Sequence, residues 1–251
     1  MFERSDLVVD VGHSRIKWAR CSDGVVDDVL KGACSINEID VLLDWIRQDV
    51  IERQPIHRVI WSPQGNTDVT EKLRDGFKAL GVSCRSLTTG SIDLPVAPAY
   101  AQLGSDRWLA LQWPWTTSQR PFCVVDCGTA VTVDAVDAEG QHLGGWIMAG
   151  LPSLARGLAD LAPQLPQADL NASNTSIPAT DSAVAIGSGF RMQLLGGVEH
   201  ALAQLRTRLG PDLACWITGG DALSLQGELN QTTRHDPDLV LRGLALAGVA
   251  E

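Results

Sequence analysis

The sequence predicts an α/β fold built from two similar halves, and three observations support this prediction. Short β-rich runs alternate with segments whose apolar residues recur every three or four positions, as strands and amphipathic helices do in a mixed sheet. A strand that ends in Asp-x-Gly and is followed by a second strand occurs at Asp10–Ser14 and again at Asp126–Ala130. The chain has 251 residues, 45% of them hydrophobic, which is enough for one large core or two smaller ones.

The first half is predicted to begin with a strand, a tight turn at Gly12 and a second strand that alternates polar and apolar residues. An amphipathic helix is then expected, because five apolar residues recur at spacings of three and four. The expected elements are strands at 7–11 and 15–20, a helix at 36–50, a strand at 59–61, a helix at 67–80 and a strand at 82–87.

The second half is predicted to repeat the opening pattern and then to become more helical. Glycines at 187, 189, 196 and 197 are expected to interrupt a long helix. The expected elements are strands at 122–126 and 130–134, a glycine-rich hairpin at 144–147, helices at 151–161 and 182–209, a strand at 213–217 and a helix at 239–249.

The repeated Asp-x-Gly turn suggests a duplicated domain with a cleft between the two halves. With a junction at residues 116–121, the predicted domains are 1–118 and 119–251. Coincidence is the alternative explanation, because Asp and Gly are common after any strand.

Composition and charge restrict the classes of function. The formal net charge is −10, and so acidic a surface repels nucleic-acid backbones and anionic lipids, although a local pocket can still attract a nucleotide. The apolar run at 7–11 is too short for a signal peptide, and no later stretch approaches 18 apolar residues. We therefore expect a soluble, cytoplasmic protein that binds neither nucleic acid nor membrane.

The cysteines do not form a metal-binding or redox motif. No CxxC pair occurs, whereas zinc sites and redox-active dithiols need close spacing. Buried thiols are the simpler interpretation, because free cysteine behaves mostly as a small hydrophobic residue. The six residues are Cys21, Cys34, Cys84, Cys123, Cys127 and Cys215.

The two Asp-x-Gly turns are candidates for binding phosphate. Neither a GxxxxGK[ST] loop nor a GxGxxG fingerprint follows the first strand, so phosphates must be held in another way. A strand–turn–strand with Gly and Ser or Thr at its tip offers free backbone N–H groups and a hydroxyl, which form an anion nest. The Asp at the strand end can position hydrated Mg²⁺. Two such turns facing each other would hold a triphosphate from both sides.

Two further segments can be interpreted in more than one way. Ser105 is expected to cap a helix that runs through Leu111, with Asp106 in its first turn. Asp106 then either stabilises the helix dipole or acts as a general base. The two glycines of Thr218–Asp221 permit close approach of a flat ligand, but a simple loop before a helix fits equally well.

Six segments, in this order, resemble one family over nearly the whole chain. That family is type III pantothenate kinase, which belongs to the actin-like sugar-kinase superfamily with ribonuclease-H-like domains and includes relatives similar to the Bvg accessory factor. The segments are Asp10–Lys17, Gly104–Arg107, Asp126–Ala130, Gly144–Gly150, Thr180–Gly189 and Thr218–Asp221.

The resemblance implies transfer of the ATP γ-phosphoryl group to the primary hydroxyl of pantothenate, the first step toward coenzyme A. It assigns the general base to Asp106, a Mg²⁺ ion held through water to Asp10, and a K⁺ or NH₄⁺ ion to Asp126. It also implies a homodimer whose pantothenate pocket borrows residues from the partner subunit. The implied ATP contacts are Asp10, Val11, Gly12, His13, Ser14, Arg15, Ile16, Lys17, Thr129, Gly219 and Gly220. The implied pantothenate contacts are Tyr100, Gly104, Ser105, Asp106, Arg107 and Thr180.

The chain departs from the family pattern at three positions. His13 replaces the usual Asn, and Ala149 replaces a Pro. The family's Tyr, seven residues before the Gly-x-Asp-Arg motif, is Ala97 here, while the chain's only tyrosine is Tyr100.

Two alternatives remain open from the sequence. One is a kinase of the same fold that acts on another hydroxylated substrate. The other is a degenerate relative that binds a nucleotide or a partner protein without catalysis. The presence of both Asp106 and Asp126 argues against the degenerate relative, because binding alone needs no base.

Overall fold

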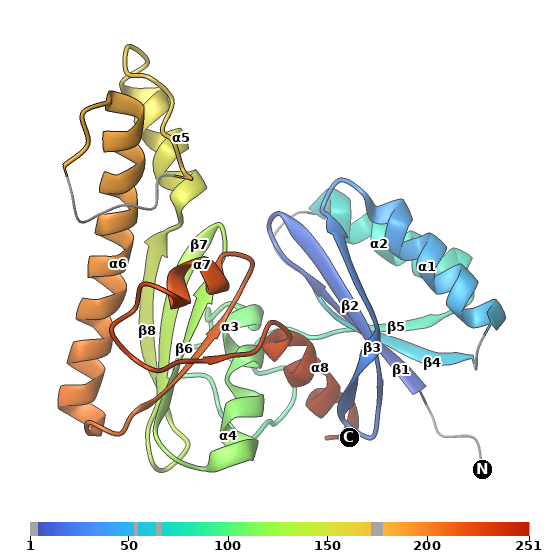
Figure 1. The fold of residues 1–251 in the computed structure, drawn as a ribbon. Coiled ribbons are helices and arrows are strands. Elements are labelled where there is room, and N and C mark those ends of the chain that lie inside the picture. Colours follow the sequence, from blue (N-terminus) through green and yellow to red (C-terminus); the bar gives the residue numbers. More distant parts are fainter. Residues whose placement is uncertain (1–4, 53–54, 64–66, 172–177, 251) are drawn as a thin grey trace. The chain divides into compact units, whose positions relative to one another are not determined.

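A computed structural model describes residues 5–52, 55–63, 67–171 and 178–250 of the chain. The chain divides into two compact units, and each is described by itself (Figure 1). The first unit comprises Met1–Arg120, Ala138–His142 and Asp238–Glu251. The second comprises Pro121–Asp137 and Leu143–Pro237. Each unit contains one five-stranded mixed sheet, which confirms the predicted α/β class.

The first unit is built on a sheet of strand order β3-β2-β1-β4-β5. The central strand β1 pairs antiparallel with β2 and parallel with β4, as the predicted strand–turn–strand and the later helical crossover require. Its strands are β1 (Ser5–Val11), β2 (Arg15–Ser22), β3 (Val25–Ser35), β4 (Ile56–Ser62) and β5 (Ser83–Ser86). Its helices are α1 (Ile39–Glu52), α2 (Thr67–Ala79), α3 (Ser105–Ala110), α4 (Gln112–Ser118) and α8 (Leu239–Val249).

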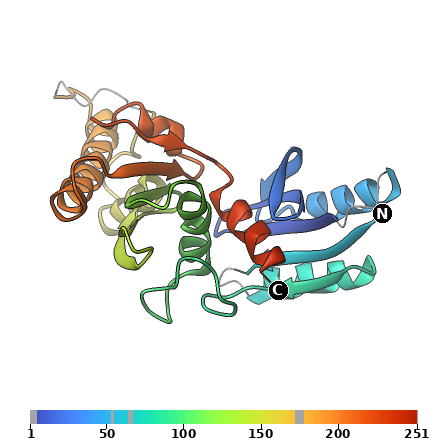
Figure 2. The ribbon, with the colours of Figure 1, turned by 90° about the horizontal axis from the view of Figure 1, so that it is seen from below.

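Helices cover both faces of this first sheet. Helices α1 and α2 lie on one face of the sheet (Figure 1). Alternate residues of β1, such as Leu7 and Val9, share one buried cluster with residues of both helices. The opposite face carries α8 (Figure 2). An added Cβ on Gly248 of α8 would lie 2.7 Å from the Cδ1 atom of Ile60 in β4. The central strands β1 and β4 are therefore largely buried, whereas β3 and β5 at the two edges are mostly exposed or half-buried.

The second unit repeats this arrangement with strand order β10-β9-β6-β7-β8. The central strand β6 pairs antiparallel with β7 and parallel with β9, just as β1 pairs with β2 and β4. Its strands are β6 (Phe122–Cys127), β7 (Ala130–Val136), β8 (His142–Ala149), β9 (Ala214–Thr218) and β10 (Arg234–His235). Its helices are α5 (Leu151–Leu161), α6 (Ser182–Leu209) and α7 (Ala222–Gln226).

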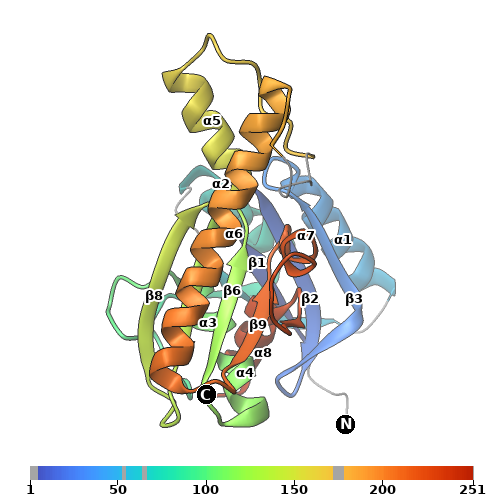
Figure 3. The ribbon, with the colours of Figure 1, turned by 60° about the vertical axis from the view of Figure 1, so that its left-hand side comes forward.

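The long helix α6 lies across one face of the second sheet (Figure 3). Its buried residues Leu194, Val198 and Leu202 share a core cluster with residues of β6, β7 and β9. Helix α5, by contrast, has no buried residue, and it extends beyond the ends of the strands (Figure 3).

Two local predictions for the second unit were wrong. The glycines do not interrupt α6, which is a continuous helix of 28 residues. Gly187 instead allows close packing, because a Cβ there would lie 1.9 Å from the Asp169 carbonyl oxygen. The glycine-rich segment 144–147 is the middle of β8 and not a hairpin; the turn that joins β7 to β8 precedes it at 138–141.

The last helix, α8, belongs to the first compact unit although it is the final element of the chain. It packs on α3 so closely that a Cβ on Gly243 would lie 2.2 Å from the Leu109 carbonyl oxygen. The compact units therefore do not follow a single cut in the sequence, whereas the predicted domains, 1–118 and 119–251, do. Those domains, and the cleft between them, stay a prediction.

A helix that crosses a bilayer needs about 20 predominantly apolar residues. None of the helices in the described ranges is long and apolar enough to cross a membrane.

Candidate functional site

The first predicted phosphate turn joins β1 to β2. The amide of Gly12 donates a hydrogen bond of 2.9 Å to the Arg15 carbonyl oxygen, and this closes the turn. The side chains of His13, Ser14 and Arg15 at the tip are exposed. The predicted strand, turn and strand are thus confirmed, and the tip presents polar groups to a ligand.

Asp10 stands at the carboxyl end of β1, beside one cation and one hydroxyl. In the sheet register it pairs with Lys17 of β2 on one side and with Ser62 of β4 on the other. Ligands of α/β proteins bind at the carboxyl ends of strands. The sequence indicated Asp10 and Lys17 but missed Ser62, for which the available signal was a polar residue that ends an apolar strand.

Ser62 connects this strand end to the segment that carries Asp106. Ser62 is fully buried, and its hydroxyl lies 2.9 Å from the hydroxyl of Ser105, the first residue of α3. The expectation that Ser105 caps α3 was wrong: Gly104 is the N-cap residue, and no side chain caps the helix. The Ser105 hydroxyl is engaged by Ser62 instead.

The Asp106 carboxylate folds back over the start of α3. Its Oδ1 atom accepts a hydrogen bond of 2.8 Å from the Arg107 amide. A Cβ on Gly104 would lie 2.6 Å from the same oxygen, so only glycine leaves room for this orientation. No residue in the described ranges donates a hydrogen bond to Oδ2 of this half-buried side chain. One oxygen of Asp106 therefore stabilises the start of α3.

Arg107 and Tyr100 lie together in the same unit. Arg107 is buried, and its Nη1 atom donates a hydrogen bond of 2.9 Å to the Tyr100 hydroxyl, while the tyrosine is partly exposed. The structure thus brings the predicted residues Tyr100, Gly104, Ser105, Asp106 and Arg107 to one place. Thr180, the remaining predicted pantothenate contact, is an exposed residue of the second unit, just before α6.

The second predicted phosphate turn joins β6 to β7. It has two residues, 128 and 129, whereas the first turn has three, 12 to 14. The Gly128 amide donates a hydrogen bond of 3.0 Å to the Ala130 carbonyl oxygen, and the Thr129 side chain is exposed. Asp126 occupies the position equivalent to Asp10: it pairs in register with Thr132 of β7 and with Thr218 of β9.

Two glycines let other segments approach this second turn closely. Gly219 has a φ of +96°, and a Cβ there would lie 2.3 Å from the Cys127 carbonyl oxygen, which also accepts a hydrogen bond of 3.0 Å from the Asp221 amide. A Cβ on Gly150 would lie 2.4 Å from the Gly128 carbonyl oxygen. The predicted Thr218–Asp221 segment and the start of α5 therefore both pack closely against the turn.

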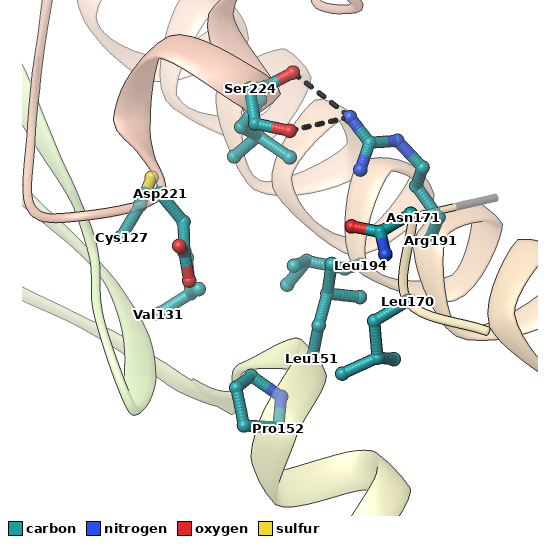
Figure 4. Close-up of a pocket in the computed structure, with 11 residues that line it drawn as sticks. Cys127, Val131, Leu151, Pro152, Leu170, Asn171, Arg191, Leu194, Asp221 and Ser224 are labelled. Atoms are coloured by element: carbon teal, nitrogen blue, oxygen red, sulfur yellow. Dashed lines mark hydrogen bonds between the residues drawn. The ribbon is translucent and has the colours of Figure 1, made fainter. Parts of the chain in front are cut away.

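A cavity of about 260 Å³ opens beside this turn, within the second unit (Figure 4). Its apolar wall comes largely from leucines of α5, α6 and α7, and Arg191, Asp221 and Ser224 supply polar groups. An apolar cavity with a few polar groups is typical of a small-molecule site. The lining residues are Cys127, Val131, Leu151, Pro152, Leu170, Asn171, Arg191, Leu194, Asp221, Ser224 and Leu225.

Arg191 holds the short helix α7 at the edge of the cavity. Its Nη2 atom donates hydrogen bonds to the Ser224 carbonyl oxygen at 3.1 Å and to the Ser224 hydroxyl at 2.8 Å (Figure 4). The same guanidinium forms a salt bridge with Glu228. The sequence did not indicate Arg191, because an arginine within a long helix gives no local signal of such contacts.

The cysteines are free thiols, and all of them except the exposed Cys84 are buried, largely as expected. Cys127 lines the cavity. Burial raises the pKa of its thiol well above the usual value, and the negative charges of Asp126 and Asp221 raise it further. The Cys127 thiol is therefore neutral at physiological pH and a poor nucleophile.

The two strand-end aspartates supply the kind of ligand that hard cations prefer. Mg²⁺ usually keeps several waters and binds one or two carboxylates together with substrate phosphates, which fits Asp10 beside the exposed turn. K⁺ is coordinated by oxygen atoms, which fits the carboxylate of Asp126 and the carbonyl groups of its turn. Among the described residues no three His, Cys, Asp or Glu side chains gather into a metal-binding group.

Three comparisons with known proteins bear on this site. A family model described as type III pantothenate kinase matches residues 6–204. A type III pantothenate kinase from Nitrosococcus oceani is 32% identical over 251 residues, which cover 95% of this chain and 92% of the relative.

Among solved structures, a member of the Baf family of transcriptional activators from Campylobacter jejuni superposes with a TM-score of 0.59 at 20% identity, covering 95% of this chain and 94% of that chain. A ROK hexokinase from Thermus thermophilus superposes with a TM-score of 0.54 at 13% identity, covering 96% and 97% of the two chains. At these identities the two likenesses show a shared actin-like fold alone.

Proposed function

Because the chain belongs to the type III pantothenate kinase family, we propose that it transfers the γ-phosphoryl group of ATP to the primary hydroxyl of pantothenate, with Asp106 as the general base. The assignment of the base rests on the geometry of the Asp106 carboxylate. The Arg107 amide holds its Oδ1 atom, and Oδ2 can accept the proton of the substrate hydroxyl. Phosphoryl transfer requires mainly positioning and charge neutralisation from the protein.

The chemical step moves one proton and one phosphoryl group. Oδ2 of Asp106 accepts the proton of the pantothenate hydroxyl as the hydroxyl oxygen attacks the γ-phosphorus. The bond between the γ-phosphorus and the β,γ-bridging oxygen breaks, and ADP leaves with that oxygen. The products are 4′-phosphopantothenate and ADP, and the proton then passes from Asp106 to solvent.

The residues around the base suit the acceptor. The Arg107 guanidinium can pair with the pantothenate carboxylate, and such charge-assisted hydrogen bonds are stronger than neutral ones. The Tyr100 hydroxyl fixes the orientation of Arg107 through their hydrogen bond. Gly104 and Ser105 complete this surface with backbone groups, and Thr180 is a further contact implied by the family.

The two turns and the cavity suit ATP. In the first unit the Gly12 turn offers backbone N–H groups, the Ser14 hydroxyl and the Lys17 ammonium to the triphosphate, and the flanking residues Val11, His13, Arg15 and Ile16 shape this loop. In the second unit Thr129 offers a hydroxyl. Gly219 and Gly220, which precede α7 at the rim of the cavity, suit the adenosine.

Two cations complete the proposed site. Asp10 would hold Mg²⁺ through water, and Asp126 would hold K⁺ or NH₄⁺. When bound, these ions would neutralise the negative charge of the phosphates.

A second copy of the chain is proposed to cover the apolar surface of the second unit. Helix α5 buries none of its residues, and its Leu161 is 88% exposed. Trp146 and Ile147 of β8 are also exposed. A helix with an unburied apolar face normally packs against another element. Light scattering should give twice the chain mass of 26.9 kDa, and a monomer would contradict the homodimer.

We also propose that the protein is located in the cytoplasm.

A coupled ADP-release assay tests the function directly. The purified protein, ATP, Mg²⁺ and K⁺ are mixed with and without pantothenate. We expect ADP release that depends on pantothenate. Release with a different hydroxylated acceptor alone would favour a same-fold kinase of other specificity, and no release with any acceptor would favour a degenerate nucleotide-binding relative.

A further inference from the structure

Ser62 is a fully buried polar residue that lies outside all six family-like segments. It ends β4, and in the parallel register of the first sheet it is the neighbour of Asp10. Its hydroxyl is 2.9 Å from that of Ser105, which precedes Asp106 in the chain. Ser62 therefore links the end of β1, which carries Asp10, to the start of α3, which carries Asp106.

The hydroxyl pair is well suited to hold the start of α3 in place. Ser62 is 0% and Ser105 is 9% exposed, so water cannot readily replace either partner. A buried hydroxyl without a partner is costly, which favours the geometry in which the two hydroxyls meet. Helix α3 has no side-chain N-cap, so this bond anchors its first residue to the sheet.

The rest of α3 is anchored independently of Ser62. The Trp108 indole N–H donates a hydrogen bond of 2.8 Å to the Val96 carbonyl oxygen. Gly243 of α8 packs directly on the Leu109 carbonyl. Loss of the Ser62 hydroxyl should therefore displace the first turn of α3, which contains Asp106, without unfolding the helix.

We propose that Ser62 is a positioning residue, which acts through Ser105 to set where Asp106 stands relative to the Asp10 turn. This inference rests on the proposed function of Asp106. A displacement of about 1 Å can cost up to ~100-fold in rate when a reacting group is misplaced. We expect Ser62→Ala to lower kcat about tenfold, with the KM for ATP changed by less than about twofold.

The experiment combines single and double variants. Ser62→Ala, Ser105→Ala and the double variant are compared for kcat, for both KM values and for melting temperature. If the two hydroxyls act as one pair, the double variant loses no more activity than either single variant. Ser5→Ala is the matched control, because Ser5 is also a buried, hydrogen-bonded serine of this sheet, at the opposite end of β1. It should leave kcat unchanged.

A second measurement separates positioning from a general loss of structure. In an Asp106→Asn background, Ser62→Ala should change the residual kcat by less than about twofold, because the group that it positions has already lost its basicity. A tenfold loss in that background, or a loss that follows melting temperature across the variants, would overturn the inference.

The outcomes also separate this inference from the proposed function. Wild-type protein that releases no ADP with pantothenate would overturn the proposed function. An active wild type with an equally active Ser62→Ala variant would overturn the role of Ser62 alone.

Discussion

The Arg107 guanidinium donates a hydrogen bond of 2.9 Å to the hydroxyl of Tyr100, seven residues earlier in the chain. Tyr100 does not occupy the position at which the family carries its tyrosine, yet the fold places its hydroxyl beside the arginine of the Gly-x-Asp-Arg motif. Arg107 is also buried. Its burial and the hydrogen bond to Tyr100 together restrict the rotamers that this side chain can adopt.

Removal of the Tyr100 hydroxyl should weaken pantothenate binding more than catalysis. A single hydrogen bond contributes about 1 kcal/mol, so Tyr100→Phe should raise the KM for pantothenate roughly fivefold and leave kcat within about twofold. Steady-state kinetics with varied pantothenate measure this. An unchanged KM would show that Tyr100 does not orient Arg107 for the acceptor.

The buried thiols should make the fold less stable in alkaline solution. Burial, aided by the charge of Asp6, raises the pKa of Cys21 from 9.0 to about 12, and the pKa of Cys127 is also raised. Unfolded thiols lose their protons near pH 9 while the folded ones keep them, so stability is full below about pH 9 and falls above it. Each thiol should contribute a loss of about 1 kcal/mol per pH unit.

Urea unfolding at a series of pH values from 8 to about 10.5 tests this prediction. Cys21→Ala should reduce the slope of stability against pH, whereas Cys84→Ala, which removes an exposed thiol, should not change it. Equal slopes for all three proteins would show that the buried thiols do not govern the alkaline limit.

The sequence predicted the elements with strong periodicity and missed the contacts that only the fold creates. Helices α5, α6 and α8 begin and end at the predicted residues, because their apolar spacing and flanking residues are local properties. The glycines of α6 were misinterpreted, since whether a glycine breaks a helix or lets a neighbour approach depends on tertiary packing.

The candidate site was predictable to a similar degree. The two Asp-x-Gly turns could be found because their residues are adjacent in sequence. Ser62 lies 43 residues from Ser105, and Arg191 lies 33 residues from Ser224. The only local signal for Ser62 is that it is a polar residue at the end of an apolar strand, and Arg191 has no local signal, because its contacts form only when the chain folds.

A monovalent cation at Asp126 should appear as a salt requirement. At matched ionic strength, activity in K⁺ or NH₄⁺ should exceed activity in Na⁺ by about tenfold or more, and Asp126→Asn should reduce that difference, because the amide lacks the charge that attracts the ion. The coupled assay in the three chloride salts measures both proteins. Equal rates in all three salts would show that Asp126 does not bind a monovalent cation needed for activity.

If Asp106 is the general base, its substitution by Asn should remove most of the turnover. Asn keeps the size of the side chain and an oxygen that can accept the hydrogen bond from the Arg107 amide, but it cannot accept the proton of the substrate hydroxyl. A positioned base contributes ~10²–10⁴-fold, so kcat of Asp106→Asn should fall by that factor while pantothenate still binds and melting temperature changes little. If Asp106 only stabilises the start of α3, the same variant should lose about 0.5–2 kcal/mol of stability and turn over nearly normally. Turnover and melting temperature measured on one preparation decide between these outcomes, and a variant with wild-type kcat would contradict the assignment of the base.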